Sequence, residues 1–130
     1  MIGLDTNILM RYFLRDDPEQ SMRAATLMKG LSPSAPGYIS SVTLAESVWV
    51  LERLYRKPKS DVVFFIRGLL ESKQLSVENQ DAVAQALRRF EGSNADFADC
   101  LIERLCDTAG CSHTMTFDVG ATKSAGMVLL

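Results

Sequence analysis

The chain opens with Met1-Ile-Gly-Leu-Asp5-Thr-Asn-Ile-Leu-Met10, a short apolar run that ends at a carboxylate with two more polar residues behind it. Apolar side chains then recur at helical spacing over residues 8–13. This pattern predicts a buried strand that turns into a helix. Asp5 would lie at the carboxyl end of the strand, the edge where open α/β sheets build their sites. A simple N-cap role for Asp5 or Asn7 is the alternative.

Size and composition place the chain among ordinary globular proteins. Its 130 residues suffice for one domain with a single core, and 47% hydrophobic with 23% charged residues is typical of such a domain. The longest apolar run, residues 62–66, is far too short to cross a membrane, and the start lacks the basic leader of a signal peptide. We therefore expect a single cytoplasmic domain over residues 1–130.

Charge and cysteine content argue against two classes of site. With 14 basic and 16 acidic residues the net charge is −2, so a surface that binds nucleic acid everywhere is not expected, and any such partner needs a local basic patch. The spacing of Cys100, Cys106 and Cys111 matches no common zinc motif, and His113 is the only histidine. We expect reduced, helix-borne, structural thiols and a structural histidine.

Strand-like and helix-like segments alternate along the chain. After the opening strand and helix, helices are expected over residues 18–30, 42–56, 59–72, 80–90 and 96–108, and strands over residues 38–40, 74–77, 112–117 and 127–130. The helix over residues 42–56 has an unusually wide apolar face that includes Trp49 and Leu54, and Ile102 is expected to point inward from the helix over residues 96–108. This order predicts an α/β protein, a three-layer α/β/α sandwich with a mostly parallel central sheet.

Glu46 has no positively charged neighbour at helical spacing, since its partners three and four residues away are apolar side chains and Thr43. A capping box formed by Thr43 and Glu46 is one interpretation. The other is a carboxylate that faces a bound metal ion, because an unpaired buried charge is costly.

Asp99 and Asp118 raise the same question. Asp99 has Asp96 three residues before it and Glu103 four residues after it, so the charges on its face of the helix are all negative. Asp118 follows a predicted strand, again at a carboxyl end. The alternatives are that Asp96 caps the helix while Asp99 is solvated, and that Asp118 is a turn or cap residue.

Four acids near one edge of a sheet suit a hard cation. Clustered carboxylate oxygens favour Mg²⁺ or Mn²⁺, and such ions favour phosphate-bearing substrates. The chemistry that fits is phosphodiester hydrolysis, in which one or two ions lower the pKa of an attacking water. Asn7 and Thr116 are uncharged candidates for hydrogen-bonding the acids or a water, with surface or turn roles equally open.

Five short motifs resemble those of PIN-domain ribonucleases, specifically VapC-type toxins of toxin–antitoxin pairs. The motifs, in order over essentially the whole chain, are Leu4-Asp5-Thr6-Asn7, Asp16-Asp17-Pro18-Glu19, Leu44-Ala45-Glu46-Ser47-Val48-Trp49-Val50-Leu51, Ala95-Asp96-Phe97-Ala98-Asp99 and Thr116-Phe117-Asp118. The resemblance implies a catalytic Mg²⁺ site formed by Asp5, Glu46, Asp99 and Asp118, with Asp96 as a supporting acid. It also implies RNA cleavage, a homodimer and inhibition by a cognate antitoxin, VapB-like or of another family. Members often carry a basic residue after the last aspartate, where this chain has Val119-Gly120, which affects substrate contacts and not the metal site.

Two basic regions are candidates for contacts with RNA. The first has four positive charges close together with Tyr55 available to stack on a base, and its basic residues are Arg53, Arg56, Lys57 and Lys59. The second is Arg11 and Arg15, which follow Asp5 in the first helix. A solvated helix end and an exposed helix face are the respective alternatives.

Two other functions remain open. An aspartyl phosphatase would use Asp5 as its nucleophile, but such enzymes usually need a second aspartate two residues on, where this chain has Asn7. A non-catalytic PIN-like module would bind a protein partner through the wide apolar helix around Trp49 and Val50. Retention of all four acids argues against that second alternative.

Overall fold

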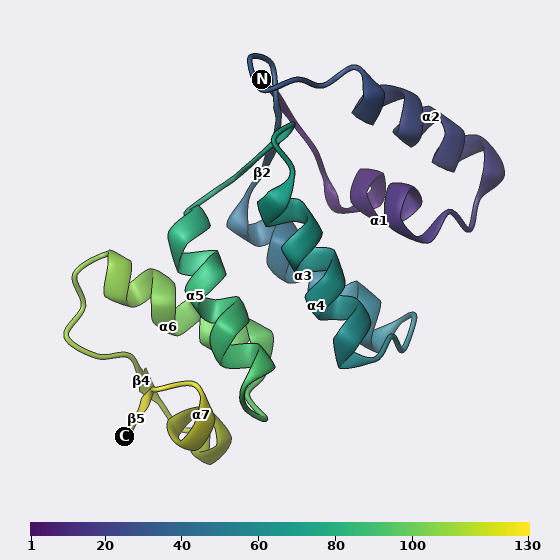
Figure 1. Ribbon diagram of the computed structural model, residues 1–130. Helices are drawn as coiled ribbons and strands as arrows, with labels where there is room; N and C mark the ends of the chain where they lie inside the picture. Colours follow the sequence, from purple (N-terminus) through teal and green to yellow (C-terminus); the bar gives the residue numbers. More distant parts are fainter. The chain divides into compact units, whose positions relative to one another are not determined.

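The computed structural model describes residues 1–130, which form two compact units, Met1–Glu78 and Asn79–Leu130. The elements of the first unit are β1 (Ile2–Gly3), α1 (Thr6–Leu14), α2 (Pro18–Lys29), β2 (Gly37–Ile39), α3 (Ser41–Arg53), α4 (Lys59–Glu71) and β3 (Leu75–Val77). Those of the second unit are α5 (Gln80–Glu91), α6 (Phe97–Thr108), β4 (Met115–Thr116), α7 (Val119–Ser124) and β5 (Val128–Leu129), and both units are drawn in Figure 1.

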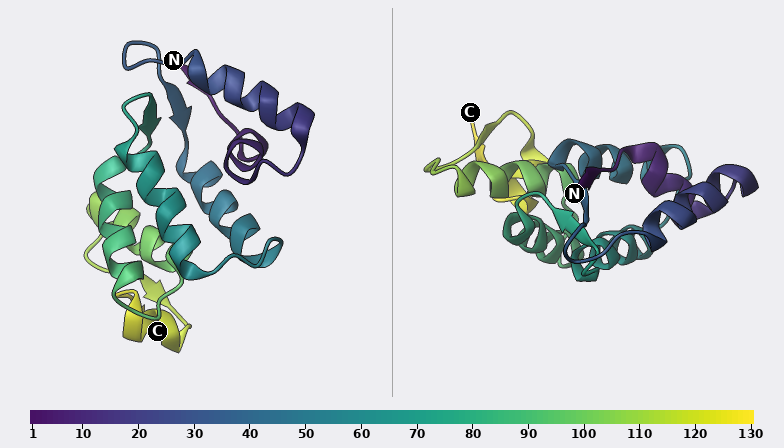
Figure 2. Two further views of the ribbon diagram at one scale, coloured as in Figure 1. Left: turned by 45° about the vertical axis from the view of Figure 1, so that its right-hand side comes forward. Right: turned by 90° about the horizontal axis from the view of Figure 1, so that it is seen from above.

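The sheet of the first unit has the order β1-β2-β3, and both of its strand pairs are parallel. Ile2 pairs with Gly37, and Gly37 pairs with Leu75, so the three short strands run side by side (Figure 2). Parallel neighbours need a crossover connection, which the helices between them provide. The carboxyl ends of β1 and β2 therefore meet at one edge, and α1 and α3 begin there. Strand β3, at an edge of this sheet, confirms the strand predicted over residues 74–77.

Helices α1, α3 and α4 supply the core of the first unit. Its most deeply buried apolar side chains are Leu9, Met10, Ile39, Leu44, Leu51, Val62 and Ile66. Gly37 allows close packing at the start of β2, because a Cβ there would lie 2.7 Å from Leu4 Cδ1. Any side chain at position 37 would push Leu4 out of the core next to the opening strand.

In the second unit α5 and α6 pack against each other, and β4 and β5 form a separate parallel pair (Figure 1). Phe90 and Phe97 meet edge-to-face with ring centroids 5.7 Å apart, a favourable aromatic geometry. Glu103 is buried, and both of its oxygens accept hydrogen bonds from Arg104. Gly126 has φ +81°, and a Cβ there would meet the Arg89 guanidinium, so glycine is required.

The predicted α/β class and the parallel pairing are confirmed, and the helix bounds agree with the expected ranges to within about three residues at each end. The strands are shorter than expected. Helix α7 was not among the helices expected from the sequence. None of the helices combines the length and the apolar character that a membrane span requires.

Three side chains expected in the core are exposed. Trp49 and Leu54 on α3 are 53% and 65% exposed, and Ile102 on α6 is 48% exposed. A helix buries only one stripe of its surface, and on α3 that stripe is Leu44, Ser47, Val48 and Leu51. Cys111 is exposed and lies beyond the end of α6, so the expectation that all three thiols are on a helix is wrong for this one.

Candidate functional site

Asp5 is the N-cap of α1. Its Oδ1 accepts a hydrogen bond from the Ile8 backbone N–H at 3.1 Å, and the side chain is exposed. The cap interpretation of Asp5 is therefore confirmed. A carboxylate has about four lone-pair positions, so the cap leaves Asp5 able to bind a cation as well.

Glu46 lies in the second turn of α3, where the Thr6 hydroxyl donates a hydrogen bond to its Oε1. The capping-box interpretation is wrong, because the N-cap of α3 is Ser40, whose Oγ accepts from the Thr43 backbone N–H at 3.1 Å. Thr6 is buried and directly follows Asp5 in the chain. This hydrogen bond therefore holds the Glu46 carboxylate beside the first turn of α1, and no Lys or Arg pairs with it.

Glu78 is a third carboxylate at this edge of the sheet, and it was not predicted as part of any site. It follows β3, and its Oε1 accepts a hydrogen bond from the Ser41 backbone N–H at 2.8 Å. The hydrogen bond from the Ser41 backbone N–H holds the pKa of Glu78 below its usual value. Glu78 therefore stabilises the first turn of α3, the helix that carries Glu46.

Asp96 and Asp99 lie together at the start of α6 in the second unit. Asp96 is the N-cap, and its Oδ2 accepts from the Asp99 backbone N–H at 3.4 Å. The pKa of Asp99 is raised, first by partial burial and then by the negative charges of Asp96 and Asp118. The predicted crowding of negative charge around Asp99 is therefore present, but the second neighbouring acid is Asp118 and not Glu103. Glu103 faces Arg104 instead, with N···O distances down to 2.7 Å.

Asp118 is the N-cap of the short helix α7. Its Oδ1 accepts from the Gly120 backbone N–H at 2.8 Å and from that of Ala121 at 3.3 Å. Thr116 Oγ1 accepts from the Asp118 backbone N–H at 2.9 Å. The cap interpretation of Asp118 is thus confirmed, and Thr116 fixes the turn that presents its carboxylate.

The predicted acids fit a hard divalent cation in their chemistry. Within neither unit do three or more His, Cys, Asp or Glu side chains converge on one point. The first unit supplies Asp5 and Glu46, and the second supplies Asp96, Asp99 and Asp118 as a crowded group with a raised Asp99 pKa. Neither Glu46 nor Asp99 pairs with a Lys or Arg side chain. Carboxylate oxygens that form no ion pair within the chain are the kind of ligand that Mg²⁺ or Mn²⁺ binds.

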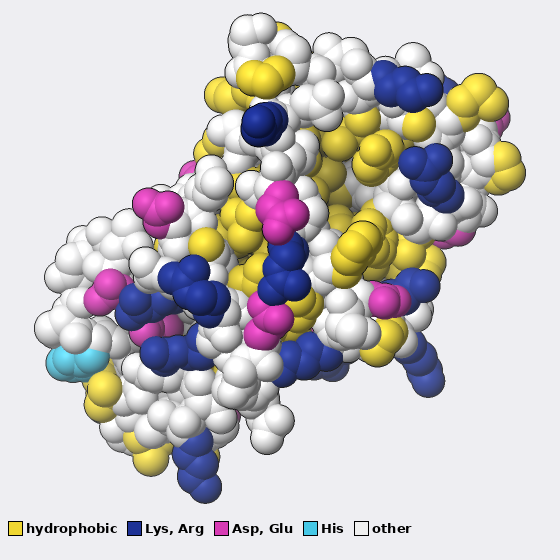
Figure 3. Space-filling view, in the orientation of Figure 1, with side chains coloured by type: hydrophobic (Ala, Val, Ile, Leu, Met, Phe, Trp, Pro, Cys, Tyr) yellow, Lys and Arg dark blue, Asp and Glu magenta, His cyan; other side chains and the backbone are white.

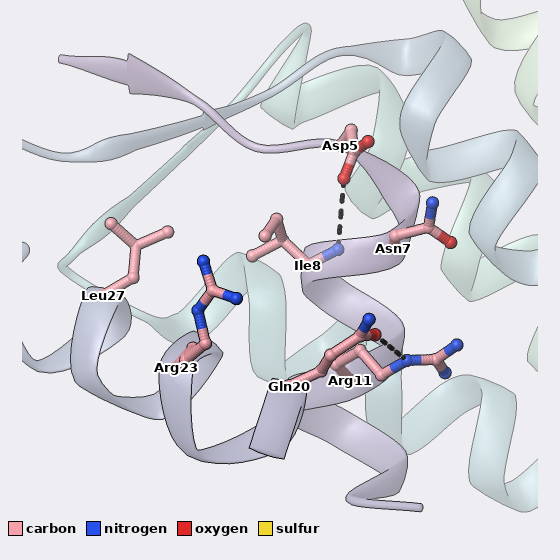
Figure 4. A pocket seen from close by; sticks show the side chains of 7 residues that line it. All are labelled: Asp5, Asn7, Ile8, Arg11, Gln20, Arg23 and Leu27. Atoms are coloured by element: carbon pink, nitrogen blue, oxygen red, sulfur yellow. Dashed lines mark hydrogen bonds between the residues drawn. The ribbon is translucent and has the colours of Figure 1, made fainter. Parts of the chain in front are cut away.

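A cavity of about 550 Å³ lies next to Asp5, between α1 and α2 of the first unit (Figure 4). Its lining residues are Asp5, Asn7, Ile8, Arg11, Gln20, Arg23 and Leu27. Asn7, which was predicted to support the acids, is exposed on its wall. Arg23 was not predicted to belong to any site, because a single arginine in an amphipathic helix carries no sequence signal of its own.

The two arginines of the first helix are engaged within the chain. Arg11 Nη1 lies 3.2 Å from Asp16 Oδ1, and its Nε donates to Gln20 Oε1 at 2.8 Å. Arg15 caps the end of α1 in a left-handed conformation, with its guanidinium 5.3 Å from the centre of the Tyr12 ring. Arg11 therefore stabilises the turn between α1 and α2, and it lines the cavity from that position.

The basic segment around Tyr55 lies at the other end of α3 from the sheet edge. Arg53 is the last residue of α3, about 10 Å along the helix axis from Glu46. The Tyr55 hydroxyl donates to Asp16 Oδ2 at 2.9 Å, and this hydrogen bond, more than the nearby Arg11, lowers the pKa of Asp16. Tyr55 is thus tied to the turn between α1 and α2. Contacts of RNA with Arg53, Arg56, Lys57 and Lys59 stay a prediction.

Comparison with known proteins identifies the fold family. The family model described as PIN domain matches residues 2–125, nearly the whole chain. A crystal structure of the Mycobacterium tuberculosis toxin VapC20, described as cleaving the sarcin-ricin loop, is similar at 22% sequence identity. That alignment covers 98% of this chain and 97% of the other, with a TM-score of 0.48. No curated protein matches the sequence. The match over residues 2–125 confirms the predicted family and, with it, an α/β fold of PIN type: the chain belongs to the PIN domain family.

Proposed function

We propose that this chain is an endoribonuclease toxin that depends on Mg²⁺, for which Mn²⁺ can substitute, and that it acts in the cytoplasm. Membership of the PIN domain family supports this function. The observation that carries it is the acidic group of the second unit, where partial burial and then the charges of Asp96 and Asp118 raise the pKa of Asp99, and no basic side chain pairs with Asp99. A divalent cation removes that repulsion, and phosphodiester hydrolysis is the chemistry that such a cation serves best.

The proposed ligands are Asp5 and Glu46 from the first unit with Asp99 and Asp118 from the second, so that residues 1–130 act as a single nuclease domain. A bound Mg²⁺ would lower the pKa of the attacking water and stabilise charge on the leaving oxygen. The chain's own contribution is to hold the carboxylates. Thr6 orients Glu46, the α7 amides hold Asp118, and Asp96 supports Asp99. Asn7 has the supporting role of hydrogen-bonding the acids or a bound water, and Thr116 fixes the turn that presents Asp118.

The proposed protein partners are a cognate antitoxin, VapB-like or of another family, and a second copy of the chain. Apolar surface in the first unit supports binding of a protein. A groove of about 310 Å³ is lined by side chains of α1, α2, α4 and β3, including Phe13 and Phe64. Hydrophobic side chains gather in a hollow on the face shown in Figure 3. Phe64 is 72% exposed, and Trp49 on α3 is 53% exposed. Large apolar side chains at a surface are typical of sites that bind another protein.

The test is cleavage of total cellular RNA by the purified chain, free of antitoxin. Discrete cuts that need Mg²⁺ and disappear with EDTA and with Asp5→Asn support the proposal. Asn keeps the α1 cap, so Asp5→Asn removes charge without removing the helix start. Glu71→Gln, which neutralises an exposed carboxylate on α4, is the matched control and is expected to cleave like the wild type. A folded chain that binds no metal and cuts no RNA would refute the assignment of the acids.

A protein-binding module without activity is the second candidate, and the apolar groove is the observation that favours it. The two functions separate when a measurement of antitoxin binding is made beside the cleavage assay. If antitoxin binding is retained while neither the wild type nor Asp5→Asn cuts RNA, the chain is a binding module. An aspartyl phosphatase is not favoured, because Oδ1 of Asp5 accepts the Ile8 amide and Asn7 occupies the position of its second acid.

A further inference from the structure

Arg23 on α2 is a cation that the fold holds at the cavity beside Asp5 without giving it a partner. Its side chain is exposed and makes no hydrogen bond or ion pair within the chain. In Figure 4 the guanidinium points from α2 into the space between Leu27 and Ile8, on the side of the cavity where Asp5 lies. An arginine that is directed into a cavity and forms no ion pair there is available for an anionic ligand.

Arg11, the other arginine of this cavity, differs in just this respect. Its Nε donates to Gln20 (Figure 4), and its Nη1 pairs with Asp16, so its charge is already balanced inside the first unit. Arg11 and Arg23 therefore have separate roles. Arg11 holds the α1–α2 turn and one wall of the cavity, whereas Arg23 offers its donors to whatever enters.

We propose that Arg23 binds a phosphate of the RNA strand next to the cleaved bond, so that the cavity between α1 and α2 receives the substrate's backbone. This inference rests on the proposed function. The cavity volume of about 550 Å³ is within the range of ligand sites, roughly 300–1,000 Å³. Guanidinium donors match phosphate oxygens in a bidentate geometry, and the apolar walls at Ile8 and Leu27 suit a ribose or base. Because Asp5 lines the same cavity, this phosphate would lie beside one of the proposed metal ligands.

The test is RNA binding by Arg23→Gln. The chain carries Glu46→Gln as well, to prevent cleavage during the measurement, and the probe is a short fluorescein-labelled single-stranded RNA of mixed sequence in Mg²⁺. Fluorescence anisotropy gives Kd at several salt concentrations. We expect Arg23→Gln to weaken binding about three- to tenfold and to reduce the salt slope by about 0.7, the value for one phosphate contact on a single strand.

Lys73→Gln is the matched control. Lys73 is an exposed cation of the same unit that precedes β3, so it lies at the amino-terminal edge of the parallel sheet, opposite the edge of Asp5. It changes the net charge equally and is expected to leave Kd and salt slope unchanged. Arg23→Lys keeps the charge but loses the bidentate geometry, so it should retain the salt slope and lose only part of the affinity.

Four outcomes have distinct meanings. A loss with Arg23→Gln alone, with melting temperatures within about 2 °C of each other, supports the proposal. An equal loss with Lys73→Gln shows general electrostatic attraction and overturns it. Unchanged binding by Arg23→Gln, while the wild-type chain cleaves RNA, overturns it and leaves the proposed function standing. If the wild-type chain neither binds nor cleaves RNA, the proposed function fails, and this inference fails with it.

Discussion

The acids of the first unit and those of the second are held in opposite ways. Glu46 receives a hydrogen bond from Thr6, and Asp5 receives one from the Ile8 amide, so these charges are stabilised by donors of the chain. The pKa of Asp99 is raised, first by its partial burial and then by the negative charges of Asp96 and Asp118. The carboxylates of Asp5 and Glu46 are thus held in place by hydrogen bonds, whereas the ionised form of Asp99 is destabilised as long as no cation is bound. A bound ion should therefore stabilise the second unit more than the first.

The largest expected effect tests whether both groups serve one reaction. Glu46→Gln and Asp99→Asn each remove one proposed metal ligand, and each should lower RNA cleavage by about a hundredfold or more. Initial rates on a labelled RNA at saturating Mg²⁺ are the measurement, with Glu71→Gln as the control. Loss of cleavage in only one of the two variants would show that the other group is not part of the catalytic site.

A smaller effect is expected for the donor that holds Glu46. Thr6→Val keeps the shape of the buried side chain and removes the hydroxyl, so cleavage should fall about tenfold and stability by about 1 kcal/mol. Thr6→Ser retains the donor and should recover most of the activity. Since the defect is one of ligand orientation, raising the Mg²⁺ concentration should recover part of the rate in Thr6→Val. Full activity of Thr6→Val would show that the hydrogen bond does not position Glu46.

The strain in the second unit predicts a gain of stability. Without metal, Asp99→Asn removes one of three crowded charges and should raise the melting temperature by about 2–4 °C, while Mg²⁺ affinity falls. Glu46→Gln should give no such gain, because the Thr6 hydroxyl loses a charged acceptor. Thermal melts with EDTA compare the two variants directly. A lower melting temperature for Asp99→Asn would contradict the crowding described for α6.

The smallest effect is in the pH dependence of these differences. Because the folded-state pKa of Asp99 is raised, its contribution favours the folded state at low pH and is lost as pH rises through that pKa. The gain from Asp99→Asn should therefore shrink as pH falls from 7 toward about 4. Glu78 has a lowered pKa, so Glu78→Gln should cost stability at pH 7, and that cost should vanish on acidification. Urea unfolding of both variants and of the wild type at the two pH values measures the changes in free energy of unfolding. If Asp99→Asn and Glu78→Gln changed stability at pH 7 in the same direction, the opposite pKa shifts of the two groups would be refuted.

Most helices and strands could be predicted from the sequence, because the residues that start a helix or form its apolar face are close together in the chain. Asp5 before an apolar helical face and Asp17 before Pro18 are start signals that the structure uses as N-caps. Helix α7 was missed since glycine at position 120 lowers helix propensity, yet Asp118 accepts from two amides and starts the helix. The environment of Asp99 was only half predicted: Asp96 is close in sequence, but Asp118 reaches it through the tertiary fold.

Contacts between distant residues account for what sequence reasoning did not find. The partner of Glu46 is Thr6, 40 residues away, whereas helical spacing offered only Thr43. Arg23 carries no signal in the sequence, because the cavity that it lines forms only where α1 and α2 come together. Trp49 was expected in the core because hydrophobicity alone cannot tell a buried stripe from a face that is left for a partner.

Three of the proposed acids are also N-caps, and this double use has an evolutionary consequence. Asp5, Asp96 and Asp118 each accept amide hydrogen bonds at the start of a helix. A descendant that lost its nuclease activity would remain under selection for Asp, Asn, Ser or Thr at these positions, simply in order to fold. The presence of these aspartates in a relative is therefore only weak evidence that the relative is a nuclease. Glu46 lies within α3 and caps no helix, so a substitution at this position is the better sign that a relative has lost the activity.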